Sequence, residues 1–100
     1  MAIEVRIPTI LRTYTSGEKS VEGKGDTLSA LFYDLDARHG GLRGRLVGVD
    51  GGLNRFVNVY LNDEDVRFLG GIETPVADGD VVTILPAVAG GAAGKDVVGG

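Results

Sequence analysis

The chain contains no cysteine and only one histidine among its 100 residues. The absence of cysteine excludes disulfide bonds and thiolate chemistry. No set of His, Asp and Glu residues has a spacing suited to a metal ion, and no glycine run has the sequence context of a phosphate-binding loop. Because an enzyme needs convergent reactive groups, the chain is not expected to catalyse a reaction alone or to bind a metal or cofactor.

Positive charge is also scarce, since 10 Lys and Arg residues stand against 14 Asp and Glu residues and give a net charge of −4. Binding to nucleic acids or anionic membranes needs clustered positive charge, so neither is expected, and a basic protein partner is favoured. The acidic residues 63–65 lack calcium-loop spacing and are interpreted as a solvated turn or a docking patch for such a partner. No signal-peptide pattern or long apolar run occurs, which favours a cytoplasmic protein.

The beginning of the sequence predicts two paired strands. Residues 3–7 alternate between apolar and charged, which is the period of a half-buried strand, and Pro8 ends it because proline has no N–H for the sheet. Residues 9–17 are expected to form a polar loop. Residues 19–22 are predicted to be a second strand in a hairpin with the first, since a lone strand could not satisfy its backbone.

One amphipathic helix is predicted next. Four apolar residues share a helical face at i, i+3, i+4 and i+7: Leu28, Leu31, Phe32 and Leu35. Asp26 or Thr27 can cap its N-terminus, and His39 is interpreted as an ordinary residue at its C-terminal end. Gly40-Gly41 should end the helix in the left-handed conformation. Residues 42–47 are predicted to add one further helical turn.

Three more strands are predicted in the second half of the chain. Residues 56–61 alternate, so that their odd-numbered members face the core and Tyr60 faces the opposite side. Residues 66–68 are expected to form a short strand. Residues 81–85 are predicted to form a buried strand that follows the turn of residues 78–80 and ends at Pro86.

This order of elements predicts an α+β fold in which one main helix packs across one face of a mixed sheet. The first and last strands are expected to be a central parallel pair. The predicted core consists of Ile3 or Val5, Leu28, Leu31, Phe32, Leu35, Val57, Val59, Val82 and Ile84. Residues 1–86 are expected to form the domain. Residues 87–100 are expected to form a flexible tail, rich in Gly and Ala, that carries Gly90-Gly91 and Gly99-Gly100.

The sheet face opposite the helix is predicted to bind partner proteins. Val82 and Ile84 should point toward the helix, so Leu85 should point away from it. Leu85, together with Phe68 and Tyr60, is therefore expected on an exposed apolar surface suited to docking.

Four segments resemble the ubiquitin-like sulfur-carrier proteins of the MoaD and ThiS family, and in particular its actinobacterial cysteine-biosynthesis branch. They are IPTILR at 7–12, GDTL at 25–28, RFVNVYLNDEDVRF at 55–68 and ADGDVVTILPAVAGG at 77–91. The resemblance spans residues 2–91 almost continuously. It implies a β-grasp fold, in agreement with the order of elements.

The resemblance also implies a mechanism. An E1-like partner enzyme would use ATP and magnesium to adenylate the terminal glycine carboxylate. Sulfur transfer would then give a thiocarboxylate that a sulfur-acceptor synthase uses in the biosynthesis of cysteine, a cofactor or a secondary metabolite. Glycine suits both steps, because a tail without side chains can lie extended in a narrow cleft and leaves the reacting carbonyl open. The alternative is a ubiquitin-like modifier or docking module without sulfur transfer.

The sequence departs from the family pattern after the first diglycine. Family members end there, whereas this chain continues with AAGKDVVGG at 92–100. Either a metalloprotease trims the tail so that Gly91 becomes the thiocarboxylate carrier, or Gly100 is itself the reactive end. A carboxylate can be adenylated only where the chain stops. Gly91 is preferred because its distance from the domain suits a site that holds the domain and the carboxylate at once.

Overall fold

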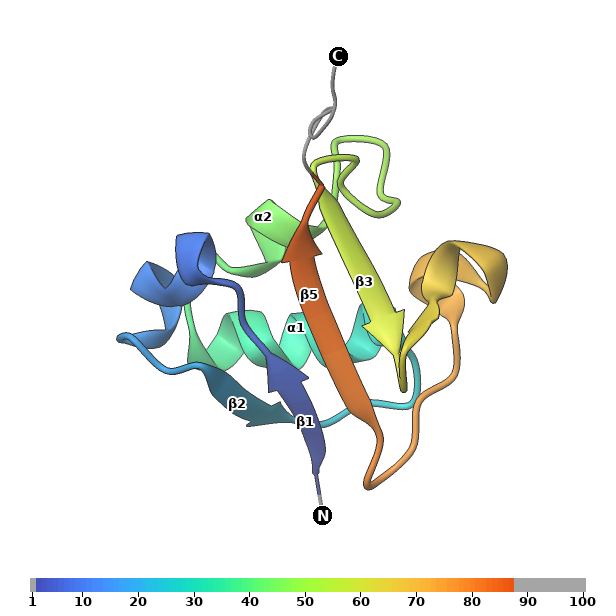
Figure 1. Ribbon diagram of the computed structural model, residues 1–100, viewed down its shortest axis with the longest axis horizontal. Helices are drawn as coiled ribbons and strands as arrows, with labels where there is room; N and C mark the ends of the chain where they lie inside the picture. The colour runs from blue at the N-terminus through green and yellow to red at the C-terminus, as the bar shows by residue number, and fades with distance from the viewer. Residues whose placement is uncertain (1, 88–100) are drawn as a thin grey trace.

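Residues 2–87, which the computed structural model describes, form one five-stranded mixed sheet with a helix across one face (Figure 1). The strand bounds are β1 (Ile3–Arg6), β2 (Ser20–Gly23), β3 (Val57–Leu61), β4 (Glu64–Asp65) and β5 (Val81–Pro86). The strands lie in the order β2-β1-β5-β3-β4. β1 and β5 run parallel at the centre, and the other pairs are antiparallel. This arrangement confirms the predicted α+β fold, the hairpin of the first two strands and the central parallel pair.

Helix α1 (Leu28–Arg38) forms where the apolar spacing predicted it. Its N-cap is Thr27, whose Oγ1 accepts a hydrogen bond from the backbone N–H of Ala30 at 3.2 Å. The four residues of its apolar stripe are completely buried. In Figure 1 the helix lies behind the sheet and crosses it, so one face of the sheet is covered and the other is left open.

The end of α1 differs in detail from the prediction. His39 is the C-cap with φ −134°, which is not a left-handed conformation. The left-handed residue is Gly41 with φ +92°, and its backbone N–H is held by the carboxylate of Asp36 at 3.1 Å. The chain then enters α2 (Arg43–Leu46), which is the further turn that the sequence predicted.

The predicted core is confirmed between α1 and the sheet. Each of its residues is at most 4% exposed. The structure adds five residues that are equally buried: Ile7, Leu11, Leu42, Leu46 and Val66. These five come from the turns and connecting segments, which therefore close the edges of the core.

The polar loop predicted for residues 9–17 is wrong over most of its length, because the 3₁₀-helix η1 (Thr9–Thr15) occupies it. The segment folds down because Leu11 is 3% exposed and so belongs to the core. The backbone N–H of Leu11 donates to the carbonyl of Pro8 at 2.9 Å, the i to i+3 pattern of this helix type. The hydroxyl of Thr15 is also buried and lies 2.9 Å from the carbonyl oxygen of Glu18.

The short strand predicted at residues 66–68 is also wrong. The strand is β4, two residues earlier, and residues 66–68 form the 3₁₀-helix η2 (Val66–Phe68). Asn62 and Asp63 have φ of +50° and +74°, which makes the turn after β3 tight enough for β4 to begin at once. The carboxylate of Asp65 then accepts the backbone N–H of Arg67 at 2.9 Å and starts η2. A third such helix, η3 (Gly71–Glu73), follows before β5.

Gly25 lies against the first turns of α1 so closely that a side chain cannot fit. A Cβ at this position would lie 2.5 Å from the backbone N of Leu31 and 2.9 Å from the backbone C of Ala30. Because backbone atoms of a packed helix cannot move aside cheaply, Gly25→Ala is expected to lower the free energy of unfolding by about 1–3 kcal/mol. Urea titration followed by circular dichroism measures this loss.

Gly44 provides the matched control for Gly25. It lies in α2, has no atom within 4 Å of an added Cβ, and gains helix propensity on substitution. Gly44→Ala is therefore expected to leave the stability unchanged or slightly raised. Equal losses for the two variants would contradict the close packing of Gly25 on α1.

Candidate functional site

The site is built around the end of β5, where the domain leads into the tail. Pro86 is the last residue of β5 and lies opposite Val57 of β3. The backbone N–H of Ala87 still donates to the carbonyl of Phe56 at 2.9 Å. The chain is therefore held in place by the sheet up to Ala87. Four residues predicted to carry or adjoin the reactive carboxylate lie outside the described residues: Gly90, Gly91, Gly99 and Gly100.

The sheet face away from α1, here called the open face, contains the predicted docking residues of the strands. Leu85 is 45% exposed, whereas its neighbour Ile84 is 1% exposed on the helix side. Tyr60 is half-buried and lies opposite Thr83 of β5. Leu85 and Tyr60 therefore share the open face on neighbouring strands, as predicted.

Phe68 is the third predicted docking residue, and it lies on η2 instead of a strand. Its side chain is 87% exposed. The neighbouring Arg67 holds η2 to β3, because its guanidinium donates to the carbonyl of Val57 at 2.8 Å and to Oδ1 of Asn58. Phe68 is thus exposed beside β3, next to the open face and outside its strands.

A hollow of about 380 Å³ lies beside Leu85, at the carboxyl ends of β1 and β5. Its lining comes from both strands, from the start of β2 and from η1. The lining residues are Glu4, Arg6, Ile7, Pro8, Arg12, Lys19, Ser20, Thr83, Ile84 and Leu85. The sequence did not predict this hollow, since its residues come from four separate segments.

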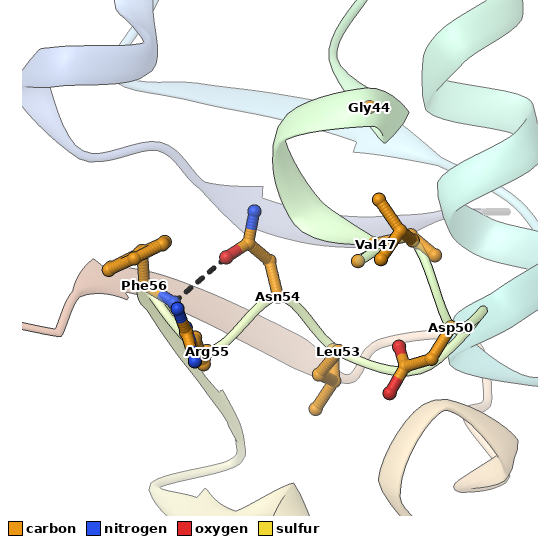
Figure 2. Close-up of a pocket in the computed structure, with 9 residues that line it drawn as sticks. Gly44, Val47, Asp50, Leu53, Asn54, Arg55 and Phe56 are labelled. Carbon is orange, nitrogen blue, oxygen red and sulfur yellow. Dashed lines mark hydrogen bonds between the residues drawn. The ribbon is translucent and has the colours of Figure 1, made fainter.

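A second hollow of about 510 Å³ is formed by residues 44–56 (Figure 2). Its loop is closed by the backbone bond from Gly48 N–H to Gly52 O at 2.7 Å. Asn54 Oδ1 accepts the backbone N–H of Phe56 at 2.8 Å, the dashed line in Figure 2. Phe56 is 64% exposed, and its carbonyl binds Ala87. This hollow therefore adjoins the point where the chain leaves β5.

The clearest electrostatic perturbation lies away from both hollows. The backbone N–H of Lys24 holds the pKa of Asp34 below its ordinary value, and the guanidinium of Arg38, 2.9 Å away, acts in the same direction. Asp34 and Arg38 belong to α1, on the covered side of the sheet. Among residues 2–87, no group of three or more His, Cys, Asp or Glu side chains is placed to hold a metal ion. In the same residues, no helix is long and apolar enough to cross a membrane.

These features define a ubiquitin-like β-grasp protein, in which one main helix packs across one face of a five-stranded mixed sheet. The chain belongs to the ThiS family, whose sequence model matches residues 5–91. The family resemblance of the sequence motifs is thereby confirmed, and so is the β-grasp fold.

Individual relatives agree with this family. The sulfur carrier protein CysO of Mycobacterium tuberculosis is 59% identical over 93 residues, which cover 91% of this chain and 100% of the relative. Small archaeal modifier protein 3 of Haloferax volcanii is 37% identical over 94 residues, covering 91% of this chain and 100% of the relative.

A solved structure shows a related protein together with another protein. CysO of Amycolatopsis orientalis has been crystallised in complex with BexX. It superposes with a TM-score of 0.84 at 61% identity, covering 90% of this chain and 100% of that one. The crystal structure of Mycobacterium tuberculosis CysO superposes with a TM-score of 0.83 at 58% identity, covering 86% and 99%.

Proposed function

We propose that this chain is a sulfur carrier that acts as a protein co-substrate of partner enzymes. The observation that carries the proposal is the extent of the family match. It begins at Val5 in β1, covers the rest of the sheet and ends at Gly91, the second residue of the first diglycine. The CysO proteins, which are sulfur carriers by name, are 59% identical and are spanned along their entire length.

In the proposed reaction, the Gly91 carboxylate is the group that changes. Hydrolysis of the bond between Gly91 and Ala92 by a metalloprotease first frees this carboxylate. In the E1-like enzyme, a carboxylate oxygen attacks the α-phosphorus of magnesium-bound ATP and pyrophosphate leaves. Sulfide then attacks the acyl carbon, AMP leaves, and the carboxylate has become a thiocarboxylate. A sulfur-acceptor synthase, in cysteine, cofactor or secondary-metabolite biosynthesis, takes the sulfur in a later step.

The fold supports this role by fixing where the tail begins. β5 pairs with β1 over residues 81–83 and with β3 over residues 82–86, so β3 holds the end of β5 to the domain. Gly91 is four residues beyond Ala87 and can therefore reach at most about 14 Å from the sheet. A partner that binds the domain thereby keeps the carboxylate within this distance of the sheet.

Leu85→Asp is expected to weaken binding to the E1-like enzyme by about 10- to 100-fold, since a leucine buried at an interface contributes about 1.5–3 kcal/mol. The fold should remain intact because Leu85 is exposed on the open face. Isothermal titration calorimetry with the purified enzyme measures the affinity, and circular dichroism checks the fold.

Ala37→Asp is the matched control for Leu85→Asp, because it adds the same charge at an exposed position of α1 on the covered side of the sheet. It is expected to bind as tightly as the unmodified chain. A folded Leu85→Asp variant with unchanged affinity would rule out the open face as the docking surface.

A second candidate function is that of a ubiquitin-like modifier, and the 37% identity to small archaeal modifier protein 3 is the observation that favours it. Mass spectrometry of the chain recovered from its own cells separates the two roles. A carrier shows the exchange of one oxygen for sulfur at its C-terminal residue. A modifier is found joined to other proteins, and a chain found only in such conjugates would replace the carrier proposal.

A further inference from the structure

The hollow beside Leu85 concentrates positive charge on a chain whose net charge is −4. Three of its lining residues are cationic: Arg6, Arg12 and Lys19. Its one acidic residue is Glu4, whose Oε2 already accepts from Nε of Arg6 at 3.1 Å. This hollow is called the basic hollow below.

The basic hollow is assembled by the backbone around Ile7. Arg6 ends β1 and lies opposite Thr83 of β5. The backbone N–H of Ile7 donates to the carbonyl of Lys19 at 2.8 Å, which brings the start of the second strand alongside. The carbonyl of Ile7 accepts from Nε of Arg12 at 3.1 Å, which holds this half-buried side chain in place. Three cations from three different segments thus line one hollow at one end of the sheet.

The charges of Arg12 and Lys19 are not compensated within the part of the chain that the structure describes. Neither residue forms an ion pair there. Of the side-chain nitrogens of Arg12, only Nε donates a hydrogen bond within residues 2–87. The N–H groups of its two terminal nitrogens are therefore available to a partner. A guanidinium held in this way binds a carboxylate through two parallel hydrogen bonds.

The opposite end of the sheet is acidic. Asp63, Glu64 and Asp65 follow one another where the chain turns from β3 into β4. The acidic turn after β3 lies near the start of β5, since Asn62 donates its backbone N–H to the carbonyl of Val81. In Figure 1 this turn lies below, while η1 and the end of β5 lie above. The two ends of the sheet therefore carry charges of opposite sign, although the net charge is negative. The basic partner expected from the sequence suits only the acidic end.

We propose that the basic hollow receives an acidic segment, with Asp or Glu side chains, of the E1-like adenylating enzyme. This inference rests on the proposed function. The hollow shares Leu85 and Thr83 with the open face and lies at the end where β5 leads into the tail. An enzyme that holds both the open face and the tail must cover it. The carboxylates then align the domain so that the tail points into the adenylation site.

The test is the affinity of the 100-residue chain for the purified E1-like enzyme, measured by calorimetry at low and at high salt. The double variant Arg12→Glu/Lys19→Glu is expected to bind at least about 10-fold more weakly at low salt, because each reversal opposes the partner's carboxylates. The difference from the unmodified chain should shrink at high salt, since salt screens exposed charges. The neutral variant Arg12→Gln/Lys19→Gln should show a smaller loss of affinity in the same direction. It tests the basic hollow even if the charge-reversed variant misfolds.

Lys24→Glu/Arg45→Glu is the control, because it makes the same change in net charge away from the basic hollow. Its affinity is expected to stay within about threefold of the unmodified chain, as long-range effects are screened. The inference is overturned if the hollow variants bind as tightly as the unmodified chain, if the control loses as much, or if the unmodified chain does not bind. If the unmodified chain binds but never gains sulfur, the proposed function is wrong. The affinities of the hollow variants and the control still test the inference in that case.

Discussion

Phe32→Ala is expected to lower the free energy of unfolding by about 3–5 kcal/mol. Phe32 is completely buried, and its volume is among the largest in the core. Removing the ring loses its transfer free energy and leaves a cavity that the paired strands cannot collapse into. Because a domain of this size is held by only about 5–15 kcal/mol, the variant should unfold at much lower urea concentration. Urea titration with an unchanged m-value measures the loss.

Tyr33→Ala is the control beside it. Tyr33 is the next residue on α1 and is exposed, with the guanidinium of Arg43 lying 4.0 Å from its ring centroid. Losing this contact is expected to cost about 1 kcal/mol or less. A loss below about 1 kcal/mol for Phe32→Ala, or one no larger than that for Tyr33→Ala, would contradict the register of α1 on the sheet.

A chain ending at Gly91 is expected to become a thiocarboxylate, whereas the chain ending at Gly100 is expected to remain unchanged when no protease is present. The reason is reach. Residues 86–91 span at most about 20 Å when extended, and residues 92–100 lengthen the tail by at most about another 30 Å. An adenylation site that binds the open face fixes the distance from the domain to the carboxylate, so the longer tail would have to buckle.

The two chains are compared under identical conditions, with the E1-like enzyme, magnesium, ATP and a sulfur source, and their intact masses are recorded over time. Gly91→Ala in the shorter chain is a useful control, because a Cβ at the reacting residue should slow the reaction in a narrow cleft. Conversion of the 100-residue chain alone would identify Gly100 as the reactive end and reject Gly91.

Most of the fold could be predicted from the sequence, because most elements bury one face and leave the other to solvent. The alternation of residues 3–7 and 56–61 and the helical spacing from Leu28 to Leu35 each specify which side chains meet in the core. The same alternation predicted that Leu85 points away from the helix, because Ile84 was expected to point toward it, and the burial of the two residues agrees.

The connecting segments could not be predicted in this way. In η1 only Leu11 and Thr15 are buried, a pattern too short to show a period, and tertiary contacts decide its conformation. The prediction of a strand at residues 66–68 was wrong because Asn62 and Asp63 adopt left-handed conformations. They make the turn after β3 tight, so that β4 begins already at Glu64. The basic hollow depends on hydrogen bonds to both backbone groups of Ile7, and no local sequence pattern indicates that cations from these separate segments line one hollow.

The most direct measurement is tandem mass spectrometry of the C-terminal peptide after the chain ending at Gly91 has been incubated with the E1-like enzyme, magnesium, ATP and sulfide. We expect the exchange of one oxygen for sulfur, located on Gly91 and absent when ATP is omitted. A Gly91 that keeps its carboxylate while the enzyme binds the chain, or that is recovered only in an amide bond to another protein, would contradict the role of sulfur carrier.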